Sequence, residues 1–177
     1  MSTSVLVGYA TRYGSTQEVA EVVAETLREG GLTVDIQPLR EVRTLAGYQA
    51  IVLGAPLFMF HWHKDALRFL SRYHDALMER PVAVFALGPV HDPYDEQEWK
   101  DSGAQLEKEL AQFPWFKPVD LHMFGGKYDP AKLGFPLKMF AGKEPASDLR
   151  DWPAVRAWAS NLAVRLEPAK VISSDPA

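Results

Sequence analysis

The residues with the clearest chemical potential lie in one short stretch near the amino terminus, from Thr11 to Thr16. Three of them carry hydroxyl groups that can donate hydrogen bonds: Thr11, Ser15 and Thr16. Gly14 lets the backbone curl closely around a ligand. A segment with helical spacing follows, and the first N–H groups of a helix lack carbonyl partners and carry a partial positive charge. The stretch therefore predicts a phosphate site; an ordinary N-capped helix start is the alternative.

The spacing within this stretch excludes two other kinds of phosphate site. It lacks the pattern G-x-G-x-x-G, whose glycines let a loop approach the pyrophosphate of a dinucleotide. It also lacks G-x-x-x-x-G-K followed by Ser or Thr, the loop that holds ATP or GTP. The sequence therefore predicts a cradle for a single phosphate group, in which Arg12 and Tyr13 also take part.

Regular elements on either side must hold this stretch in place. Five short runs rich in β-branched or large apolar residues are typical of buried strands: residues 5–9, 34–36, 50–54, 82–87 and 119–124. Four segments have helical spacing of apolar residues: 15–29, 64–78, 95–112 and 152–166. The connection between the second and third strands is short, so we expect no helix there, a vestigial one, or a turn-rich piece at residues 42–45.

This alternation of strands and helices favours an α/β fold with a parallel sheet, right-handed crossovers and helices on both faces. Ligands bind such sheets beyond the carboxyl ends of the strands, where the strand order reverses. The stretch Thr11–Thr16 directly follows the first strand, so the fold places it at that edge.

The motif T-x-x-G-x-T, formed by Thr11, Gly14 and Thr16 between the first strand and the first helix, resembles the phosphate loop of the flavodoxin family. The resemblance extends over about residues 4–166. It implies FMN as the cofactor and a doubly wound, five-stranded parallel sheet in the order 2-1-3-4-5 with helices on both faces. We expect one domain over residues 1–167, followed by a disordered tail, 168–177.

By this resemblance, two loops hold the flavin ring. The first, residues 54–63, carries many apolar and aromatic side chains, which give a flat ring a large contact area. The alternative is that another subunit or the rest of the fold covers it. The residues expected to contact the cofactor there are Pro56, Leu57, Phe58 and Met59.

The second loop, residues 88–94, is expected to present backbone groups of Gly88, Pro89 and Val90 to the polar edge of the ring. Tyr94 either stacks on the ring or caps the next helix. Beyond the fifth strand, Gly126 and Lys127 are further candidates, because a double glycine at residues 125–126 permits close approach of a ligand or of another backbone. A simple turn is the alternative.

No protein nucleophile is required, because the cofactor carries the redox chemistry. His61, His63 and Lys127 are candidates for stabilising negative charge on the reduced flavin, and a histidine can also move a proton near neutral pH. His61 and His63 are therefore the candidate catalytic residues; solvated loop histidines without a redox role are the alternative.

Within the flavodoxin-like proteins, three stretches resemble the quinone-dependent protoporphyrinogen oxidases: Gly54-Ala55 with its aromatic loop, Gly125–Tyr128, and residues 142–152. That resemblance implies an FMN-dependent oxidoreductase that takes electrons from a tetrapyrrole and passes them to a quinone. Residues 92–108, where that family has its substrate- or membrane-contacting loop, are acidic in this chain. The alternatives are an electron carrier between protein partners and a binding domain that has lost its flavin.

An insertion at residues 128–145 combines apolar side chains with lysines. It is suited to contact a membrane surface, a carboxylate-bearing substrate or a partner; the alternative is that it folds over the sheet edge with its lysines in water.

Composition limits the remaining possibilities. The 23 acidic and 19 basic residues give a net charge of −4, which argues against nucleic-acid binding. The absence of cysteine excludes disulfides and thiolate metal sites, and we expect no metal. No segment resembles a signal peptide or a membrane span, so we expect a cytoplasmic protein. Its expected partners are a redox protein or a small electron donor or acceptor, a quinone among them, and an oligomer is compatible with the sequence.

Overall fold

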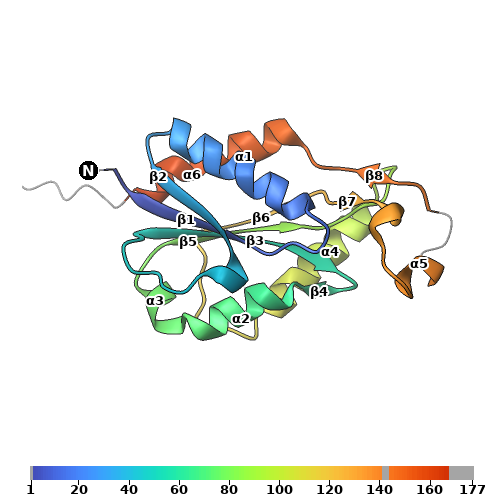
Figure 1. Ribbon diagram of the computed structural model, residues 1–177, viewed down its shortest axis with the longest axis horizontal. Helices are drawn as coiled ribbons and strands as arrows, with labels where there is room; N and C mark the ends of the chain where they lie inside the picture. Colours follow the sequence, from blue (N-terminus) through green and yellow to red (C-terminus); the bar gives the residue numbers. More distant parts are fainter. Residues whose placement is uncertain (1, 141–143, 168–177) are drawn as a thin grey trace, which may run out of the picture.

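The computed structural model describes residues 2–140 and 144–167. Five parallel strands form the central sheet in the order β2-β1-β3-β5-β6 (Figure 1). Because β5 and β6 are the fourth and fifth predicted runs, the expected order 2-1-3-4-5 is confirmed. The strands are β1 (Ser4–Tyr9), β2 (Thr33–Pro38), β3 (Ala50–Phe58), β5 (Val82–Leu87) and β6 (Asp120–Phe124).

Helices cover both faces of this sheet, as predicted (Figure 1). On one face α1 (Ser15–Glu29) packs beside α6 (Trp152–Leu166), and both have the predicted bounds. The other face carries α2 (Lys64–Arg72), α3 (His74–Met78) and α4 (Glu96–Leu110). The single helix predicted over residues 64–78 is therefore wrong at Tyr73, which leaves helical geometry while its hydroxyl donates to the Val42 carbonyl.

The side chains of β1, β3 and β5 alternate between two apolar layers. Val5 and Val7 of β1 face α1 and α6, whereas Leu6 faces the α2 side. The helical element between β2 and β3 is the short 3₁₀ helix η1 (Leu39–Glu41), so the prediction of a vestigial helix there is confirmed.

The loop predicted from Gly54 to His63 is wrong over much of its length. Strand β3 continues to Phe58 and pairs with the antiparallel β4 (His61–Trp62). The strand can continue because β4 satisfies the backbone of its last residues. Met59 and Phe60 form the turn of this hairpin, and both have positive φ, 48° and 66°. Such a turn matches the twist of the strands, but it normally contains Asn or Gly.

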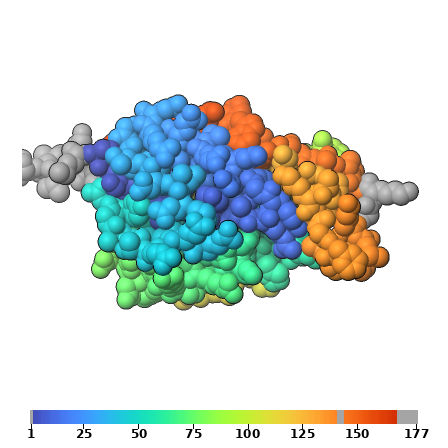
Figure 2. Space-filling model, viewed as in Figure 1, coloured from blue at the N-terminus to red at the C-terminus, as the bar shows by residue number. Residues whose placement is uncertain are grey.

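The insertion forms a small unit of its own at the carboxyl ends of the strands (Figure 1). A two-stranded antiparallel sheet, β7 (Lys127–Tyr128) with β8 (Ser147–Asp148), closes its base. Between them lie the 3₁₀ helix η2 (Pro130–Lys132) and α5 (Leu137–Phe140). Figure 2 shows this unit beside the start of α1, and Lys132 Nζ donates to the Tyr13 carbonyl at 3.2 Å.

Phe135, Met139 and Phe140 of the insertion remain exposed. Among residues 2–140 and 144–167, no helix is long and apolar enough to cross a membrane. The predicted tail, residues 168–177, lies outside the described residues.

Candidate functional site

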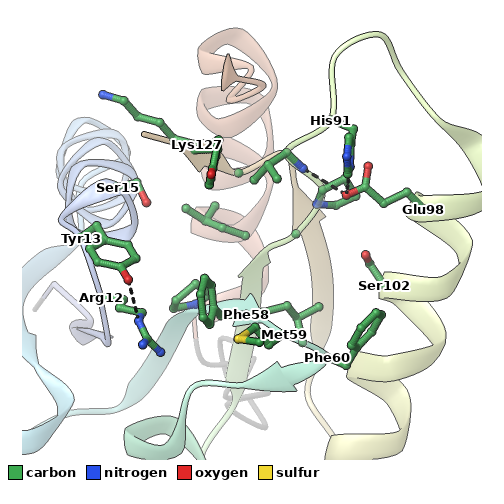
Figure 3. Close-up of a pocket in the computed structure, with 18 of the residues that line it drawn as sticks. Arg12, Tyr13, Ser15, Phe58, Met59, Phe60, His91, Glu98, Ser102 and Lys127 are labelled. Carbon is green, nitrogen blue, oxygen red and sulfur yellow. Dashed lines mark hydrogen bonds and ion pairs between the residues drawn. The ribbon is translucent and has the colours of Figure 1, made fainter. Parts of the chain in front are cut away.

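A cavity of about 540 Å³ opens where the carboxyl ends of the strands meet the insertion (Figure 3). The sequence placed its candidate cofactor residues in four separate segments, and the fold brings most of them to this cavity. Those that line it are Arg12, Tyr13, Ser15, Pro56, Leu57, Phe58, Met59, Gly88, Pro89, Val90, Gly126 and Lys127.

The phosphate-loop candidate has a defined backbone. Gly14 adopts φ 95°, which a residue with a side chain rarely takes, and its N–H donates to Thr11 Oγ1 at 2.8 Å. The Thr11 hydroxyl therefore shapes the loop. The N–H of Glu18 bonds to the Gly14 carbonyl, so the N–H groups of Ser15 and the two residues after it precede the first helical hydrogen bond.

Thr16, in the first turn of α1, is completely buried. Its Oγ1 has no hydrogen-bond partner among the residues that the structure describes. Buried hydroxyls are almost always paired, so an unpaired one beside free helix N–H groups indicates a missing acceptor. Ser15, the preceding residue, lines the cavity.

Arg12 is directed at aromatic rings. Its guanidinium carbon lies 4.3 Å from the centre of the Phe58 ring, and its Nε donates to the Tyr13 hydroxyl at 3.0 Å. Figure 3 shows this group at the base of the cavity, below Ser15. The Arg12 charge is thereby held by a cation–π contact next to the apolar wall.

The hairpin supplies that apolar wall. Phe58, Met59 and Phe60 line the cavity, and the two turn residues are largely exposed, at 64% and 76%. Phe60 was not among the predicted site residues. Strained, exposed apolar residues at a cavity rim are a recurrent feature of ligand sites.

The double glycine serves backbone packing. A Cβ added at Gly126 would lie 2.7 Å from the Gly88 carbonyl oxygen, and one at Gly125 would lie 2.3 Å from that of Leu149. The Gly126 N–H donates to the Pro89 carbonyl at 2.7 Å. Of the alternatives that the sequence left open, close approach of another backbone is the one observed.

One wall of the cavity was missed altogether. Helix α4, which also packs against β4 of the hairpin, presents Glu98, Asp101, Ser102 and Gln105 to it (Figure 3). Because these residues are spaced three or four apart, they share one face of the helix. This spacing is the signal in the sequence that could have identified them. His91 joins this wall, where its Nδ1 lies 3.2 Å from Glu98 Oε1, and the Glu98 carboxylate raises the pKa of His91 above its ordinary value.

A comparison with protein families shows which family this chain belongs to. The model described as "Flavodoxin domain" matches residues 6–140, most of the chain. The chain belongs to the flavodoxin domain family.

Two curated relatives of this flavodoxin domain carry the name protoporphyrinogen IX dehydrogenase (quinone). The one from Leishmania major is 24% identical over 176 residues, which cover 92% of this chain and 75% of the relative. The one from Escherichia coli K12 is 24% identical over 174 residues, covering 89% and 93%. A flavodoxin from the domain Archaea has the same fold, with a TM-score of 0.58 at 13% identity over 94% of this chain and 100% of its own.

Within the flavodoxin domain, both candidate catalytic histidines lie outside the cavity lining. His61 Nδ1 is 3.4 Å from Glu109 Oε1 of α4. His63 caps α2, where its Nδ1 accepts from the Asp65 N–H at 3.2 Å, and burial lowers the pKa of His63 below its ordinary value. Trp62 between them is buried in the core.

Tyr94 also lies apart from the lining of the flavodoxin domain's cavity. Its ring stacks on Trp99 at 6.0 Å, and the side chain of Asp95, its neighbour, caps α4 instead. Among residues 2–140 and 144–167, no group of three His, Asp or Glu side chains is placed to hold a metal ion.

Proposed function

We propose that this flavodoxin domain binds FMN, with the phosphate on residues 11–16 and the flavin ring between the hairpin and the loop at residues 88–90. The observation that carries the proposal is Thr16, a fully buried hydroxyl without a partner at the head of α1. A phosphate oxygen would accept from this hydroxyl and from the free N–H groups of the first helical turn.

The residues around the cavity fit the rest of such a ligand. Phe58, Met59 and Phe60 offer apolar surface to a flat ring, and Gly88, Pro89 and Val90 also line the cavity. Lys127 supplies a cation at the insertion side of the cavity. When bound, FMN supplies the redox chemistry, while these side chains orient it and limit its contact with water.

We further propose that the protein is an oxidoreductase. The names of the two curated relatives support protoporphyrinogen as electron donor and a quinone as acceptor.

One observation favours the alternative of an electron carrier. The cavity wall on α4 carries Asp95, Glu98 and Asp101, whereas His61 and His63 lie outside the cavity lining. Carboxylates beside the flavin would repel the propionates of a tetrapyrrole and attract a basic protein partner.

The first test is the cofactor itself. The full-length chain should purify as a yellow protein that releases FMN on denaturation, as chromatography against FMN and riboflavin standards would show. A colourless protein that takes up neither flavin would overturn the proposal. Turnover of protoporphyrinogen with a quinone, compared with electron transfer to a protein acceptor at low and high salt, then separates enzyme from carrier, since only docking of charged proteins weakens steeply with salt.

A further inference from the structure

We propose that Arg150 is a positioning residue for the phosphate: it neutralises Glu18, a carboxylate that lines the phosphate end of the cavity, and ties the start of α1 to the insertion. This inference rests on the proposed FMN site.

The Glu18 carboxylate lies where its negative charge would repel the phosphate of FMN. It lies one turn into α1, lines the cavity with Ser15, and is 53% exposed at its side chain. An uncompensated carboxylate there would repel a dianionic phosphate. The cavity therefore needs a cation that holds this carboxylate.

Arg150 is built into the fold to do so. Its side chain is only 4% exposed, and its Nη1 donates to Glu18 Oε2 and, at 3.3 Å, to the Ser15 carbonyl. Asp148 binds the other side of the guanidinium with two hydrogen bonds of 2.8 and 2.7 Å. Trp152 covers one face, with its ring centre 4.8 Å from the guanidinium carbon. A planar fork held at this many points is rigid, which suits Arg and not Lys.

The contacts of Arg150 connect two segments that lie far apart in the sequence. Asp148 belongs to β8, at the end of the insertion, and Ser15 is the first residue of the phosphate-binding helix. Arg150 thus joins two segments 135 residues apart at the point where the phosphate binds. The hydrogen bonds from Arg150 also lower the pKa of both Asp148 and Glu18, which keeps both carboxylates ionised and bound to it.

The matched control is Arg156, which pairs with Glu25 of the same helix at 3.7 Å, outside the lining of this cavity. Both pairs join α1 to the carboxyl-terminal part of the chain, but only the partner of Arg150, Glu18, lines the cavity.

The test compares FMN with riboflavin, which lacks the phosphate, by fluorescence titration of the full-length chain. Arg150→Gln should weaken FMN binding about tenfold, the scale of one unmasked charge at a partly exposed site. It should leave riboflavin binding unchanged, as should Arg156→Gln for both flavins. Glu18→Gln/Arg150→Gln should regain most of the lost FMN affinity.

Equal losses for both flavins, no loss, or a double variant as weak as Arg150→Gln would overturn the inference. If Arg150→Gln does not fold, Glu18→Gln alone decides: it removes one negative charge near the phosphate while Asp148 still holds Arg150, so FMN should bind more tightly, and unchanged affinity counts against the role. A wild-type chain that binds neither flavin would instead refute the FMN site itself.

Discussion

The proposed phosphate end of the cavity, at residues 11–16, and its proposed ring end differ in how they are built. At the phosphate end, one continuous segment from Thr11 to Thr16 shapes the loop and holds the unpaired Thr16 hydroxyl. At the ring end, the hairpin, the loop at residues 88–90, the insertion and α4 each supply a part. A site made from one loop–helix junction depends on local geometry, whereas a site made from four segments depends on how the sheet arranges them.

The ring end also separates neighbouring residues by role. In the hairpin, Trp62 is buried and its Nε1 donates to the Ala55 carbonyl at 3.1 Å, while Phe60, two residues earlier, is 76% exposed at the cavity rim. Apolar character alone did not distinguish the core residue from the rim residue.

The largest expected effect is on stability and comes from truncating each of these two aromatic side chains in turn. Trp62→Ala removes a fully buried side chain and should lower the free energy of unfolding by about 3–5 kcal/mol. Phe60→Ala should change it by less than about 0.5 kcal/mol, since an exposed side chain loses little burial. Urea unfolding followed by circular dichroism measures both. Equal losses would mean that the hairpin tip packs as part of the core.

The phosphate end is tested by removing its hydroxyls. Ser15→Ala/Thr16→Ala should weaken FMN binding by at least about 100-fold, since hydrogen bonds to charged groups contribute about 1.5–3 kcal/mol each. Arg12→Ala should cost no more than about threefold, because its exposed charge lies over Phe58. Fluorescence titration gives both affinities. If the hydroxyl variant retains full affinity, the phosphate loop has been misassigned.

Relieving the strain in the hairpin turn should have a smaller effect, which raises stability and weakens flavin binding. Met59→Asn/Phe60→Gly suits the positive φ of both positions and should raise the free energy of unfolding by about 1–2 kcal/mol. The same variant should bind riboflavin several times more weakly, because it removes apolar surface from the cavity. Met78→Asn, at an exposed methionine away from the cavity, is the control. A variant that gains no stability would show that the turn is unstrained.

The smallest effect concerns His63. Burial lowers the pKa of His63 in the folded state. The neutral side chain therefore contributes fully to the free energy of unfolding above the unfolded pKa of about 6.5, and this contribution is lost as the pH falls below that value. His63→Asn keeps an acceptor for the Asp65 N–H and should reduce the loss of stability between pH 7.5 and 5.5 by a few tenths of a kcal/mol. Burial also lowers the pKa of His122, which affects both proteins alike. Identical pH profiles would contradict the capping role of a neutral His63.

The amino-acid sequence by itself determined the alternation of strands and helices, the bounds of α1 and α6, and the position of the loop at Thr11–Thr16, whereas the strand order came from the resemblance to the flavodoxin family. These features follow from apolar periodicity and from the chemistry of adjacent residues, which act over one turn or one strand. It also placed the candidate ring loops at the edge of the sheet where the cavity lies, because the carboxyl ends of parallel strands meet there.

Only the tertiary structure decided which side chains face the cavity. The extension of β3 to Phe58 depends on its pairing with β4, and that register buries Trp62 and leaves His63 to cap α2. The α4 wall and the contact of Arg150 with Glu18 join residues far apart in the chain. No local pattern records such contacts, because the packing of the whole sheet fixes their distance and orientation.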